Sequence, residues 1–98
     1  MTIEKKATGS TLILTLSGRL DTTTSPQLEA ELKEGLAGVQ HLVLDFAALD
    51  YLSSAGLRVL LAAQKQMNKQ GDMVVRSVNE TIAEIFEVTG FSEILTIE

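Results

Sequence analysis

The chain of 98 residues contains no cysteine and no tryptophan. Without thiols it can form neither a disulfide nor a thiolate metal site, and this composition suits the reducing cytoplasm. Histidine is nearly absent too, since His41 is the only one. No group of histidines and carboxylates has metal-ligand spacing, and no glycine-rich loop could hold a phosphate. We therefore expect no bound metal and no cofactor.

Long apolar runs and basic stretches are missing as well. The longest fully apolar run is 59–63, far short of the ~20 residues that a membrane helix needs. The polar residues 1–6 do not resemble a signal peptide. Eight scattered Lys and Arg against thirteen Asp and Glu leave a net charge of −5, which disfavours binding to nucleic acid. We predict a cytoplasmic protein with no nucleic-acid or membrane partner.

A hydrophobic content of 45% with a single proline indicates one folded domain over residues 1–98. After a turn at Gly9 and Ser10, Leu12, Leu14 and Leu16 alternate with other residues, as in a strand with one buried face. That strand is expected to end within 18–21. Periodicity and end signals predict helices over about 26–36, 54–70 and 80–89, and strands over 41–46, 73–76 and 94–97.

The predicted order of elements is β-β-α-β-α-β-α-β. Strands that alternate with helices form right-handed crossovers and pair in parallel. The expected fold class is therefore α/β, with a mixed and largely parallel sheet flanked by helices. Ser25 is the expected N-cap of the first helix, followed by Pro26 at its first position.

Two adjacent serines, Ser53 and Ser54, lie between a predicted strand and the second predicted helix. A serine at a helix N-terminus can cap the helix, carry a phosphate or act as a nucleophile. A hydrolase elbow needs glycine two residues before the serine, where this chain has Tyr51 and Leu52. The chain also offers only His41 as a histidine base. We therefore expect no enzymatic activity. Ser54 could cap the helix, carry a phosphate or do both.

Three motifs in this order resemble the STAS domain, over about residues 3–97. They are Gly-x-Leu-Asp at 18–21, Ser-Ser-x-Gly-Leu at 53–57 and Thr-Gly-Phe at 89–91. More narrowly, the chain resembles the single-domain anti-sigma factor antagonists of bacteria. The resemblance implies the STAS fold and a regulatory binding protein that is switched by phosphorylation.

In that family the phosphate acceptor is the serine two residues before Gly-Leu, which here is Ser54 before Gly56. Ser53 is the second candidate, and it stands where well-known members carry aspartate. The resemblance implies that the unphosphorylated form binds an anti-sigma factor that is itself a serine kinase, and so releases the sigma factor. A metal-dependent serine phosphatase restores this form.

The aspartate of the Gly-x-Leu-Asp motif corresponds to Asp21, which the resemblance implies to contact the kinase. Its alternative role is to cap the polar turn at 22–24. Asp50 and Arg58 could flank the same surface. The predicted partner-binding residues are therefore Asp21, Ser53, Ser54, Gly56 and Arg58. The alternative function is a STAS scaffold that does not switch, or an accessory subunit of a transporter or stress-signalling complex.

Overall fold

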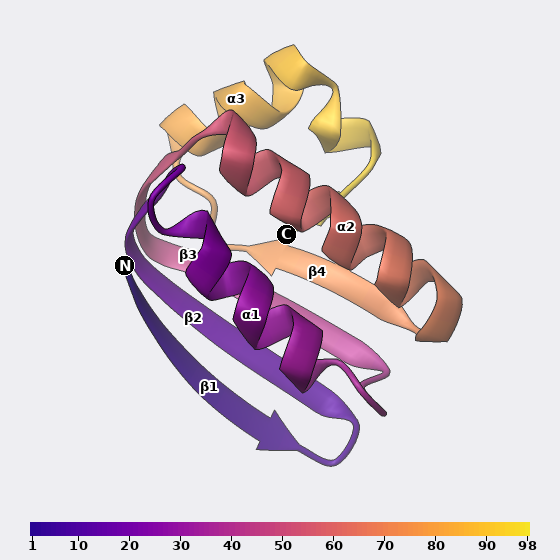
Figure 1. Cartoon of the computed structure of the whole chain (residues 1–98). Coiled ribbons are helices and arrows are strands. Elements are labelled where there is room, and N and C mark those ends of the chain that lie inside the picture. The colour runs from indigo at the N-terminus through magenta and orange to yellow at the C-terminus, as the bar shows by residue number, and fades with distance from the viewer.

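The computed structural model describes all 98 residues and contains one five-stranded sheet with three α-helices (Figure 1). The elements in chain order are β1 (Thr2–Thr8), β2 (Thr11–Leu20), α1 (Ser25–Gly35), β3 (His41–Leu52), α2 (Ser54–Gln70), β4 (Asp72–Arg76), α3 (Glu80–Thr89), the short 3₁₀ helix η1 (Phe91–Glu93) and β5 (Thr96–Ile97). This order confirms the predicted alternation of strands and helices.

The strands lie in the sheet in their sequence order. β1 and β2 form an antiparallel hairpin, while β2, β3, β4 and β5 pair in parallel. The predicted mixed, largely parallel sheet is thus confirmed. Because parallel strands point the same way, the loops after β2 and β3 leave from the same edge of the sheet.

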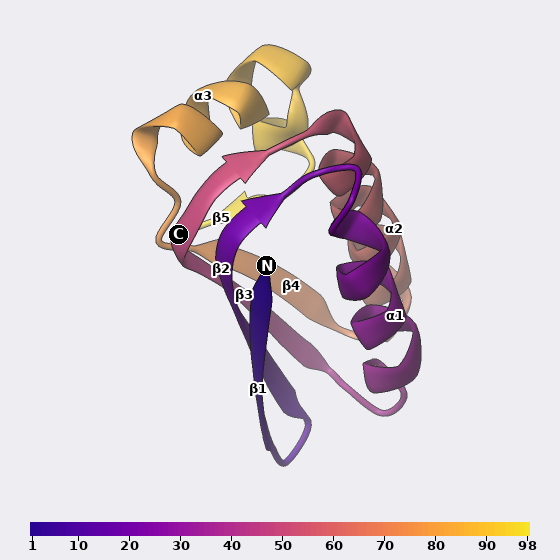
Figure 2. The ribbon, with the colours of Figure 1, turned by 60° about the vertical axis from the view of Figure 1, so that its left-hand side comes forward.

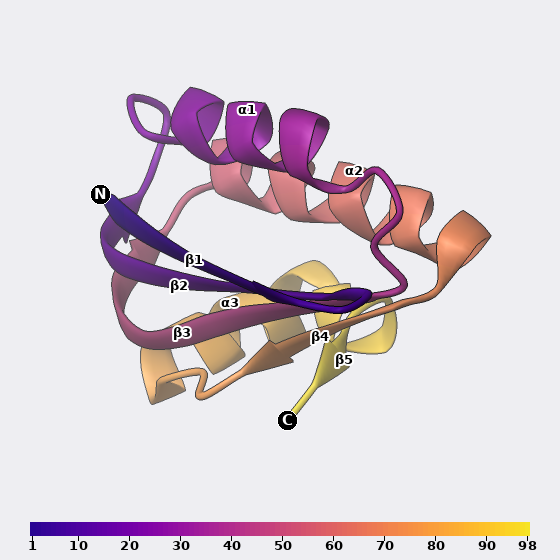
Figure 3. The ribbon, with the colours of Figure 1, turned by 90° about the horizontal axis from the view of Figure 1, so that it is seen from below.

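Helices α1 and α2 lie side by side over one face of the sheet (Figures 1 and 3). Helix α3 lies apart from them and contacts β3 (Figure 2). The alternating leucines of β2 face the helices, and Leu14 pairs in register with Leu44. Both of these side chains are fully buried, as are Phe46 of β3 and Phe86 of α3. The predicted period of two in β2 therefore marks the face that forms the core.

Strand β3 is longer than predicted, since it continues from residue 46 to Leu52. Its register with β2 shifts between Thr15 and Ser17 and again between Gly18 and Arg19. The two exposed residues Ala47 and Ala48 interrupt the buried alternation at the first shift. An irregularity of this kind breaks the period of two without ending the strand. The alternation in the sequence therefore predicts a strand that is too short.

The other two differences lie at element ends. Thr24 rather than Ser25 is the N-cap of α1, and Ser25 is buried as the first helical residue, with its hydroxyl donating to the Asp21 carbonyl. The predicted last strand over 94–97 contains only Thr96–Ile97. The residues before it turn because the Phe91 carbonyl accepts hydrogen bonds from the N–H groups of residues 94 and 95.

Gly71 ends α2 at a point where another backbone segment comes close. A Cβ atom at this position would lie 1.8 Å from the carbonyl oxygen of Gln40. We expect Gly71→Ala to lower the free energy of unfolding by about 3 kcal/mol, because one of the two segments must move. Gly35→Ala is the matched control, since its Cβ would make only an ordinary contact at 3.5 Å with Leu12.

Alanine at position 35 should leave stability unchanged or raise it by about 0.5 kcal/mol. Urea denaturation of the three proteins measures both effects. Similar stabilities of the two variants would contradict the close approach at Gly71.

Candidate functional site

The loop after β2 and the start of α2 lie next to each other. Leu20 and Leu52, the last residues of β2 and β3, are partners in register. The N–H group of Ser53 donates a hydrogen bond of 2.9 Å to the carbonyl of Leu20. The structure therefore places the loop of Asp21 beside the serine pair.

Ser53 is the N-cap of α2. Its backbone is extended, and its hydroxyl accepts a hydrogen bond of 3.4 Å from the Gly56 N–H group. Ser54 is the first helical residue; it is exposed, and its hydroxyl has no hydrogen bond within the protein. The alternative that Ser54 caps the helix is therefore wrong, because Ser53 does so. The hydroxyl of Ser54 remains free for modification.

Gly56 positions the first turn of α2 on the ends of the two strands. It is buried, and a Cβ atom there would lie 2.7 Å from atoms of both Leu20 and Leu52. Only a residue without a side chain permits this approach. Gly56 therefore has a packing role in the first turn of α2, while its contact with a partner stays a prediction.

Asp21 holds the loop before α1 in place. Its Oδ1 atom accepts hydrogen bonds from the N–H groups of Thr23 at 3.0 Å and Thr24 at 3.1 Å. The bond from Thr24 is the main reason that the pKa of Asp21 lies below its ordinary value of 3.8; the N–H of Thr23 and the charge of Arg19 add to it. The capping role proposed for Asp21 is thus present. Its Oδ2 atom lies 3.6 Å from Nε of Arg19.

Arg58 lies on the second turn of α2, exposed, and forms no ion pair. It lines a groove of about 220 Å³ between the first two turns of α1 and the first two turns of α2. The lining residues are Thr22, Ser25, Pro26, Glu29, Ala55, Arg58 and Val59. Asp50 is exposed near the end of β3. The predicted residues therefore lie at one end of the molecule.

One pair of residues at this end was not predicted. The guanidinium of Arg19 lies over the ring of Tyr51, 4.2 Å from its centre. The two residues are partners in register on β2 and β3. No local sequence pattern predicts this contact, because the contact depends on the pairing of β2 with β3.

His41 does not belong to this site. It begins β3, at the opposite end of the strand from the serines, and its Nδ1 atom lies 3.0 Å from a carboxylate oxygen of Asp72. It therefore cannot serve as a base for Ser53 or Ser54. The chain forms no group of three potential metal ligands, and none of its helices has the length and apolarity needed to cross a membrane.

The family model of the STAS domain matches residues 2–98. The chain belongs to this family. BtrV of Bordetella bronchiseptica, which is named as an anti-sigma factor antagonist, is 41% identical over 88 residues, covering 88% of this chain and 76% of BtrV. An anti-sigma F factor antagonist of Paenibacillus polymyxa is 34% identical, covering 97% of this chain and 84% of that protein.

This STAS domain also has the fold of the anti-sigma factor antagonist SpoIIAA of Bacillus, at 18% sequence identity. The TM-score is 0.79 with the unphosphorylated form, covering 99% of this chain and 87% of SpoIIAA. With the phosphorylated form the TM-score is 0.78, covering 99% and 91%. The expected STAS fold is thereby confirmed.

The two serines should contribute differently to stability. Ser53→Ala removes the cap and is expected to lower the free energy of unfolding by about 1 kcal/mol. Ser54→Ala removes a hydroxyl without a hydrogen bond, so we expect a change of less than about 0.5 kcal/mol. Thermal and urea denaturation measure the difference. A larger loss for Ser54→Ala would contradict the assignment of Ser53 as the cap.

The lowered pKa of Asp21 predicts a pH-dependent contribution to stability. The folded protein binds a proton on Asp21 less tightly than the unfolded chain does. The carboxylate therefore contributes its full stabilisation above pH 3.8 and loses it as the pH falls below this value. Asp21→Asn keeps an acceptor oxygen and removes only the charge. We expect the wild type to exceed this variant in stability at pH 7, and this difference to shrink progressively as the pH falls below 3.8. A difference independent of pH would refute this role of the charge.

Proposed function

We propose that this STAS domain is an anti-sigma factor antagonist whose binding to its partner is switched off by phosphorylation of Ser54. The observation that carries the proposal is the exposed, unbonded hydroxyl of Ser54 beside the Asp21 loop. Support also comes from BtrV and the Paenibacillus protein, both of which are named as antagonists of anti-sigma factors. The proposed partner is an anti-sigma factor with serine kinase activity, and the proposed location is the cytoplasm.

In the proposed reaction the Ser54 oxygen attacks the γ-phosphorus of ATP bound to the kinase. The bond from this phosphorus to the bridging oxygen breaks, ADP leaves, and the hydroxyl proton passes to a base of the kinase. A metal-dependent serine phosphatase hydrolyses the ester and restores the free hydroxyl. The antagonist supplies the acceptor in this cycle and no catalytic group.

A phosphate at the first position of α2 is compatible with the helix. It adds about −1.5 to −2 charges at pH 7, and a helix N-terminus stabilises a negative charge by roughly 0.3–1 kcal/mol. The similar TM-scores with the two forms of SpoIIAA, 0.79 and 0.78, support a switch that leaves the fold intact. The phosphate therefore acts on the surface that the partner meets.

That surface already carries acidic groups. Asp21 adjoins the serine pair through the paired strand ends, and Asp50 is exposed near the end of β3. A dianion added at Ser54 must lose water when the partner binds. A loss of about 3 kcal/mol in binding free energy lowers the affinity about a hundredfold.

Incubation of the protein with ATP and a candidate anti-sigma factor kinase tests the proposal. We expect one phosphate, on Ser54 by mass spectrometry, and none on Ser54→Ala. The unmodified protein should bind the kinase in calorimetry, while Ser54→Asp should bind it about a hundredfold more weakly because of the added charge.

Ser53→Ala is the matched control, since it changes the adjacent hydroxyl and should still be phosphorylated. A phosphate on Ser53 would show that Ser53, and not Ser54, is the phosphate acceptor. Absence of both phosphorylation and binding would favour the alternative of a STAS scaffold that does not switch.

A further inference from the structure

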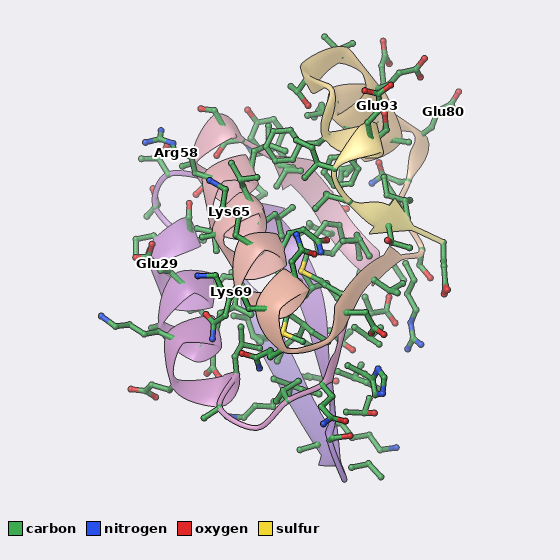
Figure 4. All side chains as sticks on the ribbon, turned by 90° about the vertical axis from the view of Figure 1, so that its right-hand side faces the viewer. Glu29, Arg58, Lys65, Lys69, Glu80 and Glu93 are labelled. Carbon is green, nitrogen blue, oxygen red and sulfur yellow. The ribbon has the colours of Figure 1, made fainter.

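Arg58 is a cation without a partner, four residues after Ser54 on the same helix. No carboxylate oxygen lies within ion-pair distance of it, although the chain has thirteen Asp and Glu. Helix α2 contains no acidic residue at all. Figure 4 shows the Arg58 side chain extending outward from the start of α2, while Lys65 and Lys69 project farther along the helix. Arg58 is therefore free to pair with a new anion near the helix start.

The spacing of Ser54 and Arg58 favours such a pair. Side chains four residues apart lie above one another on a helix, and the better orientation has the anion nearer the N-terminus. A phosphate on Ser54 would occupy that position. Arginine also suits phosphate geometrically, because its planar guanidinium can donate two parallel hydrogen bonds.

We propose that Arg58 is the internal counter-ion of a phosphate on Ser54, a role that rests on the proposed function. Arg58 is the one cation among the residues that line the groove between α1 and α2, and Glu29 is their one anion. When Arg58 turns to the phosphate, the groove loses its positive charge. Phosphorylation then changes the surface twice, by adding a dianion at Ser54 and by removing a cation from the groove.

The other charged groups at this end of the molecule are the same in all variants at position 58, so their electrostatic effect on the phosphate does not change. Arg19 and Asp21 face each other, with their nearest charged atoms 3.6 Å apart. Asp50 is exposed on β3, and Glu29 lies across the groove on α1. A comparison of variants at position 58 therefore isolates the contribution of Arg58.

The experiment uses the full chain with phosphoserine incorporated at position 54 during translation, so that no kinase is needed. A ³¹P NMR titration gives the second acid dissociation constant of the phosphate. We expect Arg58→Ala to lower this constant about threefold, because the dianion loses a positive charge at roughly 5 Å. Arg58→Lys keeps the charge and should restore most of the difference.

Lys65→Ala is the matched control, since it removes an exposed cation from the same helix. Lys65 lies ~16 Å along the helix axis from Ser54, which exceeds the Debye length of about 8–10 Å in physiological salt. Its removal should leave the constant unchanged. Equal effects of the Arg58 and Lys65 variants, or no effect of either, would overturn the proposal.

Failure of this test is distinguishable from failure of the proposed function. The titration reports on the phosphate and Arg58 alone, whatever enzyme or partner acts in the cell. The kinase assay reports on Ser54 as a substrate, whatever Arg58 does.

Discussion

The pairing of the carboxyl ends of β2 and β3 is the constraint on which the functional end of the molecule depends. The carbonyl of Leu20 accepts the N–H of Ser53, and the buried side chains of Leu20 and Leu52 support the first turn of α2. Gly56 permits this contact because it has no side chain. The same pairing places the loop of Asp21 beside the helix start, so one interaction fixes the backbone of both parts.

The two serines have different environments because a helix boundary passes between them. Ser53 keeps an extended backbone and turns its oxygen toward the helix, while Ser54 is helical and exposed. The aspartate that the family resemblance places at position 53 would fill the same role, since aspartate and serine both rank among the best N-cap residues. The departure from the family pattern therefore keeps a good N-cap residue at position 53 and leaves Ser54 as the first residue of α2.

Some charged groups around the serine pair already have hydrogen-bond or ion-pair partners within the protein, and others have none. The carboxylate of Asp21 is held by the backbone of its own turn, and Arg19 is shared between Asp21 and the ring of Tyr51. Arg58 has no such partner. A negative charge added at the helix start would therefore lie near one carboxylate held by its own turn and one cation without an ion pair.

Much of the fold could be predicted because it follows from local patterns. The alternating leucines of β2 and the helical spacing of apolar residues depend only on which side chains face the core, and the element order followed from them. The end of β3 and the start of the last strand differ from the prediction for a common reason. A register shift at Ala47 and Ala48, and a turn at 91–93, arise from pairing and packing with distant segments.

Periodicity and short motifs in the sequence suffice to predict the α/β order of elements, the family and the place of the proposed phosphorylation site, since these depend on local patterns of residues. The three-dimensional fold shows that Ser53 caps α2 and that the hydroxyl of Ser54 has no hydrogen bond within the protein. It also shows that Gly56 is a packing residue, and that Asp21 and Arg58 flank the same helix start. These assignments depend on contacts among β2, β3, α1 and α2. Because these segments are distant in the sequence, no local pattern of residues predicts such contacts.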